Sequence, residues 1–339
     1  MSLFNRRRIS TATALNAFLS FSLSMGIATT VSAASTDVLS LVPADATTVG
    51  MIRLSDMRNS PLTARLFSET DRLSVDGEAK RFLKEAGLDP ARDVDVLVAA
   101  TSPRDGSPNE PAALVLAEGR FNVARLSAAI VTRGAKSKLA AGKTYFLLEE
   151  KGQDRHGQRG AVAFVDSGLV VAGSEESVIE ALQQRSRSTQ NFRQASIIGR
   201  ELSRIDTRAT AWALIDLART RRFQGALRMP GSGASNDSLA SAMKSVSVLG
   251  ISSMDTGDAL KISAFGISND AETRDLLEDT LRGVTAAWRL AAQEKAPELV
   301  SALRKFNIDQ SGDSVTIEGT IPAALLRSFA NRAAKHHAK

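Results

Sequence analysis

Cysteine is absent from this sequence, and residues that usually build reactive or stacking sites are scarce. The 339 residues include no cysteine, three histidines, one tyrosine and two tryptophans. The lack of cysteine excludes disulfides, thiol catalysis and thiolate metal ligands. The few aromatic side chains leave little on which sugars or single-stranded nucleic acid could stack. Whatever fold the chain adopts must therefore be stabilised by its apolar cores.

The histidines are placed poorly for a metal site. His156 lies in the polar stretch KGQDRHGQRG, and His336 and His337 lie in the basic end AAKHHAK. A zinc site needs three or four ligands held in a fixed geometry. The sequence also lacks the G-x-S-x-G and H-E-x-x-H motifs of hydrolases and zinc peptidases. We expect no metal, no cofactor and no recognisable catalytic residue, which leaves enzymatic activity uncertain and disfavoured.

The N-terminus has the three parts of a secretory signal. Arg6, Arg7 and Arg8 precede an apolar run from Ile9 to about Val31, and TVSAAS follows. Small residues at Val31 and Ala33 favour cleavage after Ala33, so residues 1–33 are expected to be a signal peptide. The arginines leave the general secretory and twin-arginine routes open. An uncleaved anchor is the alternative, although several serines and threonines dilute the run. We expect a periplasmic or secreted protein without a transmembrane span after processing.

Positive charge is concentrated in one part of the chain. Residues 184–229 contain ten arginines and three acidic residues, whereas the net charge of the flanking regions is slightly negative. Guanidinium groups bind phosphate and carboxylate through paired hydrogen bonds. An anionic envelope surface or another exported protein is therefore a possible partner, and nucleic acid is not expected. The candidate anion-binding residues are Arg200, Arg204, Arg219, Arg221 and Arg222. The alternative is a solvated connector whose arginine stems pack over apolar surface.

Hydrophobic periodicity repeats along the two halves of the chain. TTVGMIRL and ATAWALIDL both end in leucine, at Leu54 and Leu217, and DVDVLVAAT corresponds to SVSVLGISS. GLVVAGSEESVIEAL and SVTIEGTIPAALLRSF share a strand, glycine and helix pattern, which aligns Gly173 with Gly319. Short links and hairpins between the strands favour antiparallel pairing. We predict an α+β protein of two similar modules, each a mostly antiparallel sheet with helices on one face.

The expected boundaries follow from this repeat. The first module spans residues 38–185, a basic connector spans 186–208, and the second module spans 209–335. In the second module, Asn269 is the expected N-cap of a long helix. The expected inner stripe of this helix consists of Leu277, Leu281, Val284, Trp288 and Ala291.

The first half resembles a known group of proteins. LVPADATTVGMIRLSDM, GLDPARDVDVLV, LAEGRF and GLVVAGSEESVIEAL are similar to segments of uncharacterised exported bacterial proteins. Their modules open on a Pro-Ala-Asp phrase and form a domain of unknown function. The resemblance implies repeated structural modules, and no site residue follows from it.

Three further motifs have structural explanations that we favour. Ser241 and Lys244 have the S-x-x-K spacing of penicillin-recognising enzymes, but no K-T-G follows. The glycine-rich stretch 229–238 lacks the Lys-Ser/Thr ending of a phosphate loop, so a linker is expected. A possible calcium loop offers Asp309, Ser311, Asp313 and Glu318. It is too short for that purpose, so a polar β-turn is expected.

The sequence thus favours a non-catalytic binding or scaffold module of the cell envelope. Two alternatives stay open: a hydrolase whose site gathers from distant positions, and a chaperone-like factor in envelope assembly. A pocket with convergent polar groups would support the hydrolase, and an open apolar groove would support the chaperone.

Overall fold

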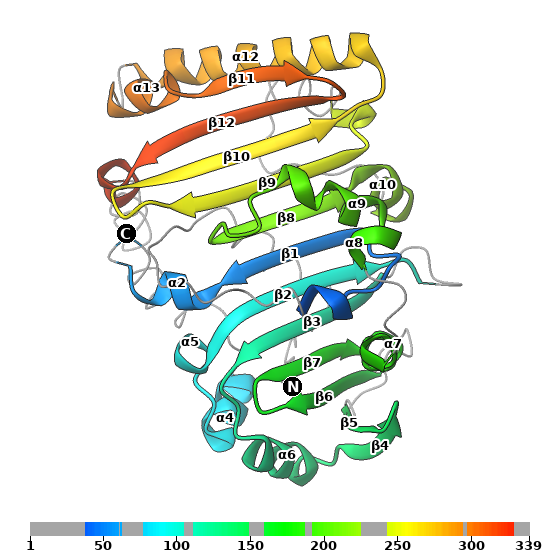
Figure 1. Cartoon of the computed structure of the whole chain (residues 1–339). Coiled ribbons are helices and arrows are strands. Elements are labelled where there is room, and N and C mark those ends of the chain that lie inside the picture. The colour runs from blue at the N-terminus through cyan, green and yellow to red at the C-terminus, as the bar shows by residue number, and fades with distance from the viewer. Residues whose placement is uncertain are drawn as a thin grey trace, which may run out of the picture.

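Every strand of the described chain belongs to one antiparallel sheet. The computed structural model describes residues 38–60, 62, 77–104, 111–148, 159–186, 192–224, 243–293 and 297–328. The twelve strands follow the spatial order β11-β12-β10-β9-β8-β1-β2-β3-β7-β6-β5-β4 (Figure 1). Their bounds are β1 Thr48–Arg53, β2 Val94–Ser102, β3 Ala112–Gly119, β4 Lys136–Ala140, β5 Lys143–Leu148, β6 Gly160–Asp166, β7 Leu169–Ser174, β8 Ala211–Asp216, β9 Val248–Asp255, β10 Ala259–Ile267, β11 Asn307–Ser311 and β12 Ser314–Pro322.

Helices flank both faces of this sheet. The 3-10 helices are η1 Val38–Leu41, η2 Glu201–Arg204 and η3 Met243–Ser245. The α-helices are α2 Leu54–Arg58, α4 Gly77–Ala86, α5 Pro90–Asp93, α6 Val123–Thr132, α7 Glu175–Ser186, α8 Phe192–Ala195, α9 Ile197–Arg200, α10 Leu217–Gln224, α12 Ala271–Ala292 and α13 Pro297–Leu303. A further helix spans residues 323–328.

The central strands are apolar on both sides because both sides are covered. In β1 every residue after Thr48 is buried, and β8 is buried except for Ile215. Both faces of β1 are covered because this strand lies in the middle of the sheet, paired with β2 and β8.

Tight hairpins set the register, as their turn residues predict. Gly257 between β9 and β10 has φ +87°, and Gly312 between β11 and β12 has φ +58°, a region that glycine adopts without strain. Gly312 and Asp313 form the turn that closes residues 309–318, the possible calcium loop, into a hairpin. The β-turn interpretation is therefore confirmed. A tight hairpin also joins β6 to β7.

The largest hydrophobic cluster spans both halves of the chain. It joins Leu116 and Val171 of the first half to Leu214 and Phe265 of the second. The two predicted modules therefore share one main hydrophobic cluster. One sheet runs through both halves, and its main core lies across the β1–β8 seam (Figure 1).

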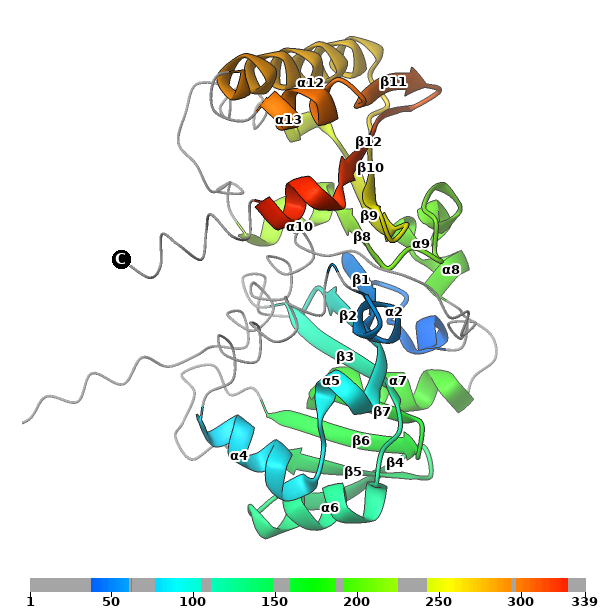
Figure 2. The same cartoon turned by 90° about the vertical axis from the view of Figure 1, so that its left-hand side faces the viewer.

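The expectation of helices on one face is wrong. Helix α7 packs on the face of the largest cluster, where it buries Val178 and Leu182. Helices α4 and α6 pack on the opposite face, where Phe121 and Leu126 are buried. Figure 2 shows α4, α6, α10 and α12 on one side of the sheet and α7, α8 and α9 on the other.

The segment expected to be a basic connector is part of the core. Among its described residues, Phe192, Ile198 and Leu202 are buried in the largest cluster. The arginines of this stretch suggested a basic connector, but its apolar residues recur at helical spacing and pack it against the sheet.

Helix α12 also departs from its expected form. Its N-cap is Asp270, whose side chain accepts a hydrogen bond from the Thr273 backbone N–H, and not Asn269. Leu277 is buried as expected, but Trp288 is 56% exposed. Within the described chain, no helix combines the length and apolar character needed to cross a bilayer.

Candidate functional site

The five candidate arginines do not form one surface. Arg200 and Arg204 lie on α9 and η2, which dock into the largest cluster. Arg219 lies on α10, whose Leu217 belongs to a cluster on the opposite face of the sheet. Figure 2 shows α9 and α10 on opposite sides of the sheet. The backbones of Arg221 and Arg222 continue α10, and their side chains lie outside the described residues.

Arg204 is engaged by acidic side chains of the protein itself. Its Nη1 and Nη2 donate to the two carboxylate oxygens of Asp313 at 2.7 and 3.0 Å. Its Nε lies 2.7 Å from Oε2 of Glu201. The hydrogen bond from Arg204 holds the pKa of Asp313 below its usual value. The guanidinium group of Arg204, a candidate for binding an external anion, thus joins η2 to the β11–β12 turn.

The other sequence candidates contribute no site within the described chain. Ser241 and the glycine-rich stretch 229–238 lie outside the described residues, as do all three histidines. Lys244 lies in η3. Across the described ranges, no group of three acidic or histidine side chains could hold a metal ion.

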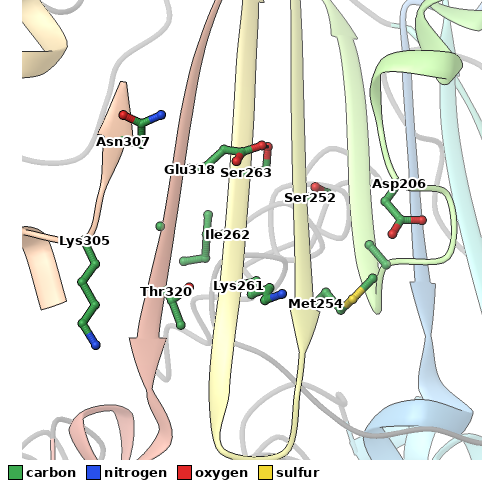
Figure 3. Close-up of a pocket in the computed structure, with 12 residues that line it drawn as sticks. Asp206, Ser252, Met254, Lys261, Ile262, Ser263, Lys305, Asn307, Glu318 and Thr320 are labelled. Atoms are coloured by element: carbon green, nitrogen blue, oxygen red, sulfur yellow. The ribbon is translucent and has the colours of Figure 1, made fainter. Parts of the chain in front are cut away.

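The structure instead shows a polar groove on the second half of the sheet. The groove has a volume of about 430 Å³. Figure 3 shows the polar side chains of β9, β10 and β12 along its floor, with Lys305 and Asn307 at one wall. Its lining consists of Asp206, Ala209, Ser252, Met254, Lys261, Ile262, Ser263, Lys305, Asn307, Glu318, Gly319 and Thr320.

Strand register arranges the groove's side chains in two rows. One row runs across the strands through Thr320, Lys261 and Met254. Because side chains alternate along a strand, the next row on the same face lies two residues away. That row contains Asn307, Glu318, Ser263 and Ser252. The Ser263 hydroxyl donates to Glu318 Oε1 at 3.4 Å.

The corresponding face of the first half is apolar. Strand pairing continues the row of Ser252 across the β1–β8 seam through Trp212, Met51 and Val98 to Leu116. Leu116 is fully buried, since this face of the first half lies under η1 and α7. The same face of the sheet is thus covered in the first half and open in the second.

The position of one helix explains why the two halves of this sheet face differ. Helix α7 follows β7 and covers the first half, whereas the helix at 323–328 follows β12 and packs Ala323 and Leu326 against Leu62. In Figure 2 this last helix, drawn in red, lies on the side of α10 and α12. No described helix therefore lies over the groove, and its polar floor remains accessible.

The charges of the groove are separated by row. Lys261 belongs to the row with Thr320, and Lys305 lies at the same end in Figure 3. Glu318 belongs to the other row, beside the hydroxyls of Ser252 and Ser263. Ammonium groups bind carboxylate or phosphate, and hydroxyls and carboxylates accept hydrogen bonds from ligand hydroxyl or amino groups. The groove can therefore orient a polar ligand that carries an anionic group at one end.

The sequence contains a signal for this groove that the repeat pattern alone does not reveal. The middle of strand β10 alternates, with Lys261 and Ser263 on one face and Ile262 on the other, whereas residues 114–117 of β3 are apolar on both faces. Such alternation indicates a strand segment with one solvated face. The groove residues were missed at the sequence level because the two repeats were aligned by their apolar positions, and the polar positions of β10 mark the exposed face.

A second polar cluster surrounds the only tyrosine. The Tyr145 hydroxyl donates to Glu175 Oε1 at 2.9 Å, and Lys138 Nζ donates to the same oxygen at 2.9 Å. Burial and the bond to Glu175 raise the pKa of Tyr145, whereas the bond from Lys138 leads the effects that lower the pKa of Glu175. These shifts move the pKa values of both groups further from neutral pH. The cluster therefore anchors the start of α7 to the β4–β5 hairpin and is poorly suited to acid–base catalysis.

The known proteins of similar structure are distant from this chain. No family model and no curated protein matches it. Solved structures of TP0453 cover most of it. Crystal form I has a TM-score of 0.43 and 14% identity over 87% of this chain and 96% of that one. Crystal form III has a TM-score of 0.44 and 14% identity over 87% and 98%. At these values the likeness supports no argument about function.

Proposed function

We propose that this chain is an exported, non-catalytic binding module that holds a polar ligand of the cell envelope in the groove on β9, β10 and β12. The observation that carries the proposal is the contrast between the two halves. One face position is filled by apolar side chains under η1 and α7, and its counterpart is open and lined by lysine, serine, threonine, asparagine and glutamate. Antiparallel sheets can leave one face to solvent, and this face offers charged and hydroxyl groups that can bind a polar ligand.

The groove favours a ligand with at least one carboxylate or phosphate group. Lys261 and Lys305 are exposed, and their ammonium groups are available at one end of the groove. Lipid headgroups, acidic polysaccharides and acidic peptides of an envelope share this chemistry. The signal peptide expected at residues 1–33 supports a location where such ligands occur.

The proposal includes duplication of one ancestral module. The strand order outward from the seam is β1-β2-β3-β7-β6 in one half and β8-β9-β10-β12-β11 in the other. The alignment of Leu54 with Leu217 also aligns Gly50 with Ala213, and these two residues pair directly across the seam. Pairing between equivalent residues is what a two-fold related interface produces.

The aligned glycines of the outer strands, Gly173 and Gly319, are offset by one residue in the sheet. Strand pairing places the counterpart of Gly173 at Glu318, one residue before the Gly319 that the sequence pattern suggested. A shift of one residue reverses the face of a strand side chain. The two glycines accordingly serve different contacts: a Cβ at Gly173 would meet the Ala113 backbone, and one at Gly319 would meet the Phe306 ring. Duplication followed by divergence of the outer strands accounts for this difference.

Binding to chemically defined probes tests the proposed function. We would titrate the protein with a uronic-acid oligosaccharide, a short peptide rich in glutamate, and glycerol phosphate, using calorimetry at two salt concentrations. The double variant Lys261→Gln/Lys305→Gln is expected to weaken binding of the preferred probe by tenfold or more. Each removed charge–charge hydrogen bond is worth about 1.5–3 kcal/mol at most.

The control removes the same charge elsewhere. Lys84 in α4 and Lys244 in η3 are both exposed and lie outside the groove lining. The variant Lys84→Gln/Lys244→Gln should bind like the original protein. Equal losses in the two double variants, or no binding of any of the three probes, would refute the groove as an anionic-ligand site.

A further inference from the structure

The polar floor of the groove on β9, β10 and β12 ends against packed apolar side chains at one end. Along β10 the groove face carries Lys261, Ser263 and then Phe265, since side chains on one face are two residues apart. Phe265 is 6% exposed and belongs to the largest hydrophobic cluster, together with Leu202 of η2. A Cβ built at Gly250, its partner on β9, would meet the Phe265 ring, so the ring lies across this strand. The polar floor therefore ends at Phe265.

The ion pair between Arg204 and Asp313 closes the same end of the groove. Arg204 of η2 holds Asp313 through two hydrogen bonds, and its Nη1 also lies 3.4 Å from the Ser314 hydroxyl. Ser314 begins β12, four residues before Glu318. In the opposite direction the strands lead to the β9–β10 turn, where residues 256–258 are exposed. The groove is thus closed beyond Glu318 and open toward the β9–β10 turn.

The two signs of charge lie at these two ends. Glu318 lies in the inner row, paired with Ser263 across the strands. Lys261 lies in the outer row, paired with Thr320, and Lys305 lies at the same end in Figure 3. The rows are two residues apart, which is about 6.5–7 Å along a strand. A ligand that spans both rows can therefore place a positive group at the closed end and a negative group at the open end.

Glu318 is better placed to bind a ligand than Asp206, the other acidic residue of the lining. Oδ1 of Asp206 already accepts hydrogen bonds from the backbone N–H and Nε of Arg208, at 2.9 and 3.3 Å. Glu318 is exposed, and the Ser263 hydroxyl donates to its Oε1 at 3.4 Å. The carboxylate and the hydroxyls of Ser263 and Ser252 together offer three acceptor groups, which matches the three N–H donors of an ammonium group.

We propose that the groove binds a short peptide of two or three residues with both termini free. Its N-terminal ammonium binds Glu318 at the closed end, and its C-terminal carboxylate binds Lys261 and Lys305 at the open end. This inference rests on the proposed function and narrows its ligand class. An extended chain spans at most about 3.3–3.6 Å per residue, so two residues bridge the two rows and a third allows for the length of the side chains. The Asn307 amide and the Thr320 hydroxyl in the lining supply donors and acceptors for the peptide bonds.

Blocking one terminus at a time tests the two ends of the ligand separately. We would measure the affinity of the protein for the dipeptide Ala-Ala, for N-acetyl-Ala-Ala, which lacks the ammonium group, and for Ala-Ala amide, which lacks the carboxylate. Ala-Ala is expected to bind at least about tenfold more tightly than either blocked form, because each blocked form loses charge-assisted hydrogen bonds. Equal binding of Ala-Ala and N-acetyl-Ala-Ala would overturn the inference, because the ammonium group would then contribute nothing.

Two variants assign each terminus to its end of the groove. Glu318→Gln should bind Ala-Ala and N-acetyl-Ala-Ala equally and should still prefer Ala-Ala to its amide. Lys261→Gln/Lys305→Gln should lose the preference over the amide and keep the preference over the acetylated form. Glu298→Gln is the matched control, because Glu298 is exposed on α13 and lies outside the groove lining. This control should retain both preferences, and an exchange of the two patterns would refute the orientation.

The probes of the proposed function separate the two levels of the argument. If glycerol phosphate binds but none of the three Ala-Ala probes does, the peptide assignment is wrong and the groove remains an anionic-ligand site. If no probe of either kind binds, both are wrong. Phosphoethanolamine carries an ammonium and a phosphate group without a peptide bond. Tighter binding of phosphoethanolamine than of Ala-Ala would assign the groove to that headgroup chemistry and overturn the peptide assignment.

Discussion

Arg204 shows that an arginine suited to bind an external anion can instead be bound by carboxylates of the protein itself. Its fork binds Asp313 bidentately, and Glu201 binds the remaining Nε. The sequence shows that an arginine-rich segment exists, but it does not show which acidic residues fold back onto it. Asp313 is 109 residues away from Arg204. Only the register of the sheet brings the β11–β12 turn next to η2.

The same limit applies to Tyr145. Its partner Glu175 is 30 residues away, and Lys138 is 37 residues from Glu175. Tyr145 lies in β5, and Glu175 begins α7. The contact of Lys138 with Glu175 depends on β4, a strand that the sequence does not predict because KSKLA has no clear alternation of apolar residues.

The Arg204–Asp313 pair predicts a specific pH dependence of stability. The pKa of Asp313 is lower in the folded protein than its usual value, chiefly because of the hydrogen bond from Arg204. A lowered folded pKa stabilises the protein above the unfolded pKa, about 3.9, and this stabilisation is lost as the pH falls through the folded pKa. The stability advantage of the original protein over Asp313→Asn should be constant above about pH 5 and should shrink below pH 4.

Urea unfolding at a series of pH values from 3 to 7 measures this difference. Asp309→Asn is the control, since Asp309 lies in the same hairpin, where no hydrogen bond or ion pair of its side chain is found in the described chain, and should give a much smaller change over the same range. If the advantage over Asp313→Asn grew as the pH fell, the sign of the linkage would be wrong and the ion pair would not be stabilising.

At the scale of single elements, local patterns predicted most strands and hairpins but misplaced a helix cap. The turn at residues 312–313 is confirmed, because a tight turn depends on neighbouring backbone atoms alone. For α12 the sequence offers Asn269 and Asp270 in succession, and both residue types are good caps. The choice depends on where the preceding strand β10 ends and the chain turns.

The cap assignment gives a direct prediction. Asp270 accepts hydrogen bonds from the backbone N–H and the hydroxyl of Thr273. Asp270→Ala should therefore lower the free energy of unfolding, because the N-cap hydrogen bond to the Thr273 backbone N–H is lost. Asn269→Ala should change the free energy of unfolding clearly less. Denaturant unfolding of the two variants compares them directly, and equal effects, or a larger effect at Asn269, would show that the helix begins elsewhere.

At the scale of the molecule, the sequence predicted α+β architecture and antiparallel pairing but could not predict that the halves join. Strands β1 and β8 are equally long, and both faces of each strand are buried once the two strands pair. Each strand alone is compatible with an independent module. The apolar residues on both faces of TVGMIR and AWALID indicate central strands, and this is the feature that distinguishes one sheet from two.

A shared core predicts that the two halves unfold together. Leu116 of β3 is fully buried in the cluster that also contains Trp212 of β8, and Leu116→Ala should cost about 2–5 kcal/mol. In a Trp288→Phe background, Trp212 is the only tryptophan, so its fluorescence reports on the second half. Circular dichroism reports on the whole sheet. For one cooperative unit, Leu116→Ala should shift both denaturation midpoints by the same amount, because the substitution in the first half weakens the packing that holds the second. If the Trp212 midpoint stayed unchanged while the dichroism curve split into two steps, the halves would be independent folding units, and the β1–β8 seam would contribute little to stability.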